Sequence, residues 1–202
     1  MPLILASSSP YRRALLRRLN LPFSVESPDI DERPRPDETP LDLALRLAGE
    51  KAAVIAARHP GALVIGSDQV AVFEGAPIGK PGSFEAARAQ LRQFGGRDVL
   101  FHTALCVTDG RRRLLEQVPT ECRFLALDEA RIEHYLRVEQ PFDTAGSAKA
   151  EQLGVALMEH MRSDDPTALI GLPLIALCRM LRAFGLDPLG AAGAPHTSLE
   201  QS

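Results

Sequence analysis

Residues 62–73 read Ala-Leu-Val-Ile-Gly-Ser-Asp-Gln-Val-Ala-Val-Phe, an apolar run that one carboxylate interrupts. The continuous apolar part, residues 62–66, predicts a central strand buried on both faces, and the strand pattern resumes over residues 70–73. An unpaired carboxylate is costly in such surroundings, so Asp68 needs a cation, a metal or backbone donors as partners. At the end of a buried strand, where α/β sheets bind ligands, Asp68 would belong to a site. The alternative is a β-turn in which Ser67 and Asp68 link two strands.

The sequence on either side of this stretch predicts an α/β fold with a mixed sheet. Strands are expected over residues 3–6 and 23–25, and a long alternating hairpin over residues 99–127 turns at Asp109-Gly110. Ser, Thr or Asp caps, two of them followed by Pro, predict helices from residue 10 to about 19, from 40 to near 60, from 84 to about 94, and from 129 to near 140. Asp165-Pro166 is expected to open a C-terminal helical region that ends at Gly185.

Composition excludes several classes of protein. The 202 residues include 23 Lys and Arg against 26 Asp and Glu, a net charge of −3, and only 5% are aromatic. This balance argues against a nucleic-acid-binding face, and no apolar run approaches the ~18 residues of a membrane span. Three scattered cysteines form no disulfide or zinc pattern, and no signal-peptide pattern is present, so a cytoplasmic protein is expected. Residues 190–202 are expected to form a flexible tail.

The junction Ser7-Ser8-Ser9-Pro10, followed by Arg12 and Arg13, is a candidate phosphate site. A helix N-terminus offers free N–H groups and the positive end of a dipole, and guanidinium groups match phosphate oxygens. The alternative is an ordinary capped helix with solvated arginines. The charged residues Glu32, Lys51 and Lys80 are, taken singly, more typical of a protein surface.

Six motifs occur in order along the chain: Leu-Ala-Ser-Ser-Ser-Pro-Tyr-Arg-Arg (5–13), Asp31-Glu32, Glu50-Lys51-Ala52, Gly66-Ser67-Asp68-Gln69, Gly79-Lys80-Pro81 and Ala145-Gly146-Ser147. Together they closely resemble the Maf family of nucleoside triphosphate pyrophosphatases over residues 3–189. The resemblance implies a single domain over residues 1–189 with a two-lobed, ITPase-like α/β fold. In that fold an elongated mixed sheet is flanked by helices, and the active site lies in the cleft.

The resemblance also implies an activity and a set of site residues. Members of the family hydrolyse the α–β phosphate bond of a nucleoside triphosphate with Mg²⁺ or Mn²⁺, releasing a nucleoside monophosphate and pyrophosphate. By motif position, Asp68 is implied as the catalytic proton acceptor, and Glu32 and Asp68 as metal ligands. The implied phosphate-binding residues are Ser8, Arg12, Arg13, Lys51 and Lys80.

The positions implied to set specificity are Tyr11, Gln69 and Glu151. Gln69 and Glu151, with Ile170-Gly171-Leu172-Pro173-Leu174, resemble the subgroup that prefers 7-methyl-GTP. A carboxylate such as Glu151 can accept from both N1–H and N2–H₂ of guanine, and an aromatic face such as that of Tyr11 stabilises a cationic ring by stacking. Tyr11 stands where the subgroup commonly has Trp, and Gln152-Leu153-Gly154 replaces a more usual Gly-aromatic-Gly run.

Two other functions stay open on the sequence alone. One is a dTTP or UTP pyrophosphatase of the same family, and the other is a nucleotide-responsive regulator of septum formation and cell division. In each case the expected partner is a nucleoside triphosphate, with no nucleic acid and no membrane. A homodimer is compatible with the family, although no apolar stripe marks an interface.

Overall fold

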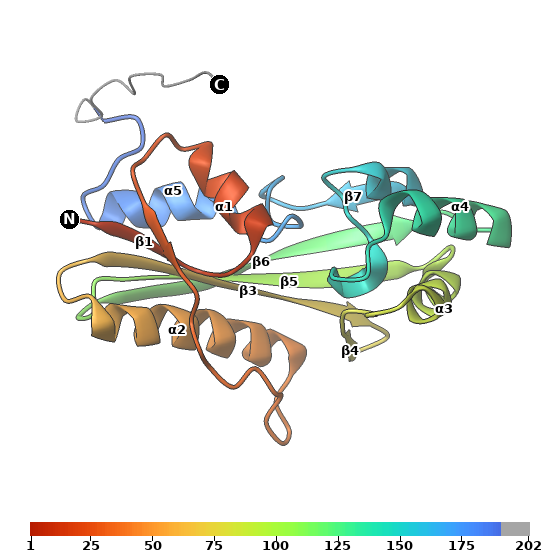
Figure 1. The fold of residues 1–202 in the computed structure, drawn as a ribbon, viewed down its shortest axis with the longest axis horizontal. Helices are drawn as coiled ribbons and strands as arrows, with labels where there is room; N and C mark the ends of the chain where they lie inside the picture. The colour runs from red at the N-terminus through yellow and green to blue at the C-terminus, as the bar shows by residue number, and fades with distance from the viewer. Residues whose placement is uncertain (191–202) are drawn as a thin grey trace.

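The computed structural model describes residues 1–190, which form an elongated seven-stranded sheet with helices on both faces (Figure 1). The strand order is β2-β1-β3-β5-β6-β7, and β4 also pairs with β3. Only the pairs of β1 with β2 and β3 are parallel. The strands are β1 (Leu3–Ala6), β2 (Ser24–Glu26), β3 (Leu63–Phe73), β4 (Ala76–Ile78), β5 (Asp98–Thr108), β6 (Arg113–Phe124) and β7 (Met158–Arg162). The predicted mixed α/β fold is therefore confirmed, and β4 and β7 are strands that the sequence patterns did not reveal.

The first four helices begin at the residues predicted from their N-terminal capping residues. Each of the four caps, Ser9, Thr39, Ser83 and Asp128, accepts the backbone N–H three residues ahead. The helices are α1 (Pro10–Arg17), α2 (Pro40–Arg58), α3 (Phe84–Phe94), α4 (Glu129–Glu139) and α5 (Leu174–Ala183). The expected tail falls almost wholly on residues 191–202, which lie outside the described part of the chain. No helix within residues 1–190 has the length and apolar character to cross a bilayer.

The C-terminal helix starts later than expected. Residues 166–171 form turns, and Asp165 acts as a remote cap instead of opening the helix. Its buried carboxylate accepts the N–H groups of Ile175 at 2.6 Å and Ala176 at 3.3 Å, at the start of α5. The prediction of a helical region from Asp165 was wrong because this side chain satisfies the free amides of a helix that begins nine residues later.

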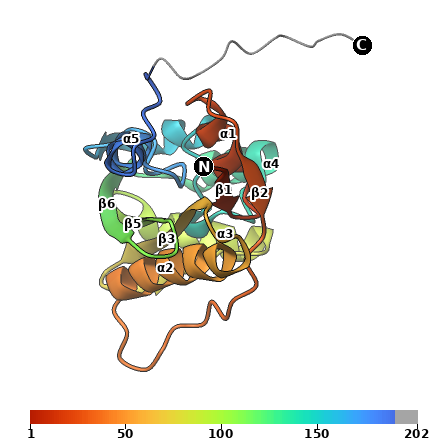
Figure 2. The same cartoon turned by 90° about the vertical axis from the view of Figure 1, so that its left-hand side faces the viewer.

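Helices cover the two faces of the sheet unequally. Helix α2 lies along one face, α1 and α5 lie on the other, and α3 and α4 gather at the far end (Figures 1 and 2). Buried side chains form three clusters that correspond to these contacts, one under α2, one under α1 and α5, and one among the aromatic residues near α3 and α4. The long strands β3, β5 and β6 run through both ends, so one sheet joins the two lobes (Figure 1).

Strand β3 is continuous, so the β-turn interpretation of Ser67 and Asp68 was wrong. Asp68 also lies in the middle of this strand and not at its end, because antiparallel pairing with β5 extends from Val64 to Val72. On the other side, β1 pairs only as far as Gly66, and β4 begins to pair at Ala71. Among the described strands, none covers the edge of β3 between these points. Asp68 thus lies at a gap in the sheet, just beyond the carboxyl end of β1.

Candidate active site

A cleft of about 360 Å³ opens beside this gap. It is lined by nine of the predicted site residues: Ser8, Tyr11, Arg12, Glu32, Lys51, Asp68, Gln69, Lys80 and Glu151. Arg13 is exposed and is not among the lining residues. The structure therefore gathers these residues around one cavity, with the exception of Arg13.

Lys51 links two carboxylates at the floor of the cleft. Its Nζ lies 2.7 Å from Asp68 Oδ1 and 2.7 Å from Glu32 Oε1. The side chains of Lys51 and Asp68 are only 7% and 11% exposed, whereas that of Glu32 is 60% exposed. The hydrogen-bonded ammonium is the cation that Asp68 needed in its apolar surroundings.

Gly66 explains how Lys51 reaches Asp68. A Cβ at Gly66 would lie 2.3 Å from the Ala48 carbonyl oxygen and 2.8 Å from the Ala52 nitrogen, both on α2. The missing side chain therefore allows the backbone of α2 to pack directly on β3. Lys51 lies between these two contacts in the sequence, so the close approach places its side chain beside the strand that carries Asp68.

The charge of Glu32 is stabilised by its neighbours. Partial burial opposes ionisation, but the hydrogen bond and charge of Lys51, together with the charges of Lys80 and Arg12, outweigh it and lower the pKa of Glu32. Burial lowers the pKa of the Arg12 guanidinium, while the charges of Asp68 and Glu32 oppose this effect. Three cations and two carboxylates therefore act on one another at this end of the cleft.

Arg12 is fixed by a carbonyl on the other side of the cleft. Its Nε donates to the Gly171 oxygen at 2.9 Å. The hydroxyl of Ser67, on β3, lies 2.9 Å from the same oxygen and 2.8 Å from Ala104 O, and these two acceptors share its single proton. Gly171 has a φ of 114°, a conformation open to glycine. The sequence motifs did not indicate that Ser67 and Gly171 hold Arg12 in position. A Ser next to Asp68 within an apolar strand was the one sequence feature that could have indicated it.

Gln69 holds the same segment. Its Nε2 lies 2.9 Å from Thr103 Oγ1, 3.1 Å from Ala168 O and 3.0 Å from Leu169 O, three acceptors that share its two hydrogens. Thr103 Oγ1 donates to Ala168 O as well. Since carbonyl oxygens can only accept, this contact fixes which way the amide points. The amide nitrogen is therefore engaged within the protein, and only the Gln69 oxygen is left to accept from a ligand.

A further carboxylate, Glu151, lines the cleft together with Asp143. Burial and the charges of Glu139 and Asp143 raise the pKa of Glu151, while its own backbone N–H and Lys149 oppose the rise. The segment is anchored on α4, because Tyr135 Oη accepts from Lys149 N and Glu139 Oε2 accepts from Leu153 N, both at 3.1 Å. Different charges thus act on Glu151 and on Glu32, and the cleft has a cationic part and an anionic part.

The motif Ala145-Gly146-Ser147 forms a tight turn beside the cleft. Gly146 has a φ of 74°, and a Cβ there would lie 3.0 Å from Cζ of Phe101. The glycine therefore serves packing against β5, while its neighbours Ala145 and Ala148 line the cavity.

Glu32 and Asp68 suit a divalent cation that is shared with a substrate. No group of three or more His, Cys, Asp or Glu side chains within residues 1–190 could hold a metal alone. The two carboxylates, however, converge on one ammonium. Enzymes usually hold Mg²⁺ through one or two carboxylates plus the phosphates of the substrate. The donor set fits Mg²⁺ bound together with a triphosphate.

Sequence comparison places this geometry in a family. The family model described as Maf-like protein matches residues 2–184. The chain belongs to the Maf family. A Maf relative from Bordetella pertussis, named 7-methyl-GTP pyrophosphatase, is 65% identical over 187 residues, covering 93% of this chain and 94% of the relative. A protein of the same name from Burkholderia pseudomallei is 59% identical over 198 residues, covering 96% of this Maf chain and 92% of the relative.

The fold of this Maf protein also has a more distant counterpart. The solved structure of the Staphylococcus aureus Ham1 protein aligns with a TM-score of 0.54 and 14% sequence identity, covering 91% of this chain and 100% of the other. This likeness confirms the architecture that the motifs implied.

Proposed function

We propose that this Maf protein hydrolyses the α–β phosphate bond of a nucleoside triphosphate and that 7-methyl-GTP is its preferred substrate. The products are 7-methyl-GMP and pyrophosphate. The observation that carries the proposal is a single cleft in which three cations lie near Glu32, two of them also act on Asp68, and a separate carboxylate, Glu151, lines the anionic part. Two relatives with 65% and 59% identity carry the name of this activity.

Asp68 is the proposed general base. One of its oxygens accepts from Lys51, which leaves the other free to accept from a water molecule. Asp68 orients this water and takes its proton as the water oxygen attacks the α-phosphorus in line. The bond from the α-phosphorus to the bridging oxygen then breaks, and pyrophosphate leaves.

Cationic side chains stabilise the charge that develops during this step. Arg12 is anchored through Nε, so its terminal nitrogens remain to contact phosphate oxygens. Lys51 and Lys80 line the same part of the cleft, together with Ser8 at the start of α1. Preorganised donors of this kind favour the transition state because they need no rearrangement as charge moves onto the leaving group.

Glu32 and Asp68 are the proposed ligands of a Mg²⁺ or Mn²⁺ ion. When bound, such an ion neutralises phosphate charge and acts as a Lewis acid. The lowered pKa of Glu32 keeps its carboxylate ionised for this role at neutral pH.

The anionic part of the cleft is proposed to read the base. An ionised Glu151 can accept from both N1–H and N2–H₂ of guanine, a pattern that thymine and uracil do not offer. N7-methylation makes the purine cationic, and the ring of Tyr11, which lines the cleft, can stack on it. The anionic surroundings of Glu151 favour the same positive charge.

A substrate panel tests the proposal. Pyrophosphate release is measured with 7-methyl-GTP, GTP, dTTP, UTP and CTP in the presence of Mg²⁺ or Mn²⁺. We expect kcat/KM to be highest for 7-methyl-GTP and low for dTTP and UTP. A preference for dTTP or UTP would show that the proposed substrate is wrong and the proposed enzyme class is right. If no nucleotide in the panel released pyrophosphate, the result would favour the alternative of a nucleotide-responsive regulator.

A further inference from the structure

The loop that carries Glu32 has no regular structure of its own. Residues 27–39 contain neither a helix nor a strand, and three prolines interrupt them. Glu32 itself is 60% exposed, and its contact with Lys51 alone does not fix the backbone on either side. A carboxylate on such a loop needs another anchor to keep a defined position in the cleft.

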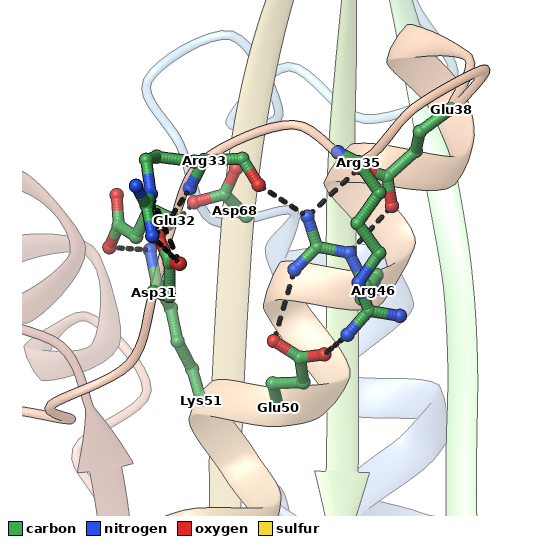
Figure 3. A network of polar contacts seen from close by, with 9 residues as sticks. All are labelled: Asp31, Glu32, Arg33, Arg35, Glu38, Arg46, Glu50, Lys51 and Asp68. Atoms are coloured by element: carbon green, nitrogen blue, oxygen red, sulfur yellow. Dashed lines mark hydrogen bonds and ion pairs between the residues drawn. The ribbon is translucent and has the colours of Figure 1, made fainter.

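Arg46 supplies that anchor from helix α2. It donates from Nε to Glu38 Oε1 at 2.6 Å and from Nη2 to Glu38 Oε2 at 2.9 Å, a two-pronged contact. Nη2 also donates to the Arg33 carbonyl at 3.0 Å, next in the chain to Glu32. Figure 3 shows Arg46 between the loop and the helix, beside the cluster of Glu32, Lys51 and Asp68.

The contact is partly buried, and further side chains bind to it. The side chains of Arg46 and Glu38 are 12% and 8% exposed, unlike most ion pairs of this protein. Glu50, one helical turn further along α2, accepts from Arg46 Nη1 at 3.1 Å and from Arg35 at 2.8 Å. Hydrogen bonds from Arg46 and from the Arg35 amide lower the pKa of Glu38 to about 2, so this pair stays charged across the physiological range.

We infer that Arg46 and Glu38 are positioning residues, which hold the Glu32 carboxylate against Lys51 so that it can serve the phosphate end of the cleft. This inference rests on the proposed function. Neither residue lines the cleft, so each acts through Glu32 and not by contact with a nucleotide. Lys51 and Arg46 lie on the same helix, so α2 fixes the position of the Glu32 loop relative to the Lys51 ammonium.

The test compares Arg46→Met with a matched control, Arg58→Met. Arg58 also lies on α2 and binds a carboxylate, Glu26, at 3.0 Å, but Glu26 ends β2 and shares no hydrogen-bond partner with Arg46. We expect Arg46→Met to lower kcat/KM by about ten-fold or more on every nucleotide, since a misplacement of ~1 Å can cost up to about 100-fold. Arg58→Met should retain wild-type kcat/KM.

Two further readouts separate positioning from general stability. In a Glu32→Gln background, Arg46→Met should cause little additional loss, because the group that it positions has already been changed. Hydrogen exchange should quicken at the amides of residues 30–38 in Arg46→Met but not in Arg58→Met. If Arg46→Met does not fold, the same comparison is made with Arg46→Lys, which keeps the positive charge but cannot make the two-pronged contact of a guanidinium.

Full activity of the Arg46 variants, or equal losses with and without Glu32→Gln, would overturn the inference. Unchanged exchange in the loop would do so as well. Because the exchange measurement needs no substrate, it also distinguishes this failure from a failure of the proposed function, in which the wild-type protein would release no pyrophosphate.

Discussion

Asp68 is a carboxylate in the middle of an apolar strand, and its partners explain why the chain tolerates it. One oxygen is bound to a buried ammonium, and the residue lines a cleft beside the gap between the ends of β1 and β4. Ser67 and Gln69, on either side, hold the 168–171 segment, so the three consecutive polar residues of β3 all serve the site. A run of three polar residues within a central strand is thus part of a continuous strand whose side chains bond to Lys51 and to the 168–171 segment, and not a turn.

Asp68→Asn should abolish turnover and leave the fold intact. Asn keeps an oxygen that can accept from Lys51, but it cannot take a proton from water, so kcat should fall by about 100-fold or more. The measurement is pyrophosphate release together with the melting temperature. Asp98→Asn is the control, because that exposed carboxylate, at the start of β5, pairs with Arg123 on β6 and does not line the cleft. Substantial turnover by a folded Asp68→Asn protein would remove Asp68 from the role of base.

The raised pKa of Glu151 predicts a pH-dependent choice of base. A protonated carboxyl offers a donor in place of an acceptor, so acidification should weaken guanine recognition. The ratio of kcat/KM for 7-methyl-GTP to that for dTTP should therefore rise with increasing pH, over a range that lies above the titration of an ordinary Glu. Using the ratio cancels the titration of groups that act on both substrates. Glu151→Gln should lower the ratio and make it independent of pH, and an unchanged profile in this variant would exclude Glu151 as the titrating group.

At the scale of elements, the contact of α2 with β3 decides where the charges lie. Gly66 allows the helix backbone to touch the strand, and α2 then carries both Lys51 and the anchor Arg46. Helix α1 contributes in a similar way, because it begins immediately after β1 and places Tyr11 and Arg12 at the gap in the sheet. The segment after α4 supplies the remaining side of the cleft.

Gly66→Ala should therefore damage both stability and activity. Its Cβ would overlap backbone atoms of Ala48 and Ala52, which cannot move without shifting α2, so the free energy of unfolding should fall by about 1–3 kcal/mol or more. The displaced Lys51 should lower kcat/KM on every nucleotide. Gly49→Ala is the matched control, because a Cβ there meets only Arg113 at 3.6 Å, and Ala in a helix interior should stabilise by about 0.5–1 kcal/mol. The measurement is thermal melting of both variants. Equal melting temperatures for Gly66→Ala and Gly49→Ala would refute the packing argument.

For the whole molecule, structural features that depend on neighbouring residues of the sequence, such as helix starts, were predicted well. Contacts between residues far apart in the sequence were not. The caps Ser9 and Thr39 act on their own helices, so the residues around them carry the signal. Asp165 caps a helix across an intervening turn, and Gln69 bonds to a carbonyl 99 residues away, so no spacing rule reveals either contact. Motif resemblance supplied the list of candidate site residues, but it could not tell that Arg13 points away from the cleft that Arg12 lines.

The division of the cleft between distant parts of the chain predicts that phosphate binding and base choice are separable. Lys80, in the loop after β4, acts on Glu32, whereas Glu151 is influenced by groups of residues 139–151. Lys80→Ala should lower kcat/KM by about ten-fold or more on 7-methyl-GTP, GTP and dTTP alike, since a charge-assisted contact contributes ~1.5–3 kcal/mol and phosphates are common to all three. Glu151→Gln should affect the guanine nucleotides alone.

In the double variant the two losses on 7-methyl-GTP should multiply, within about a factor of two, as expected for sites that share no partner. When Arg46→Met is combined with Glu32→Gln, the two losses in kcat/KM should not multiply, because Arg46 and Glu32 belong to one network. Steady-state kinetics on the four single and two double variants measure both cases with the same assay. A change in nucleotide ranking caused by Lys80→Ala, or strong coupling between Lys80 and Glu151, would mean that one set of contacts reads both ends of the substrate.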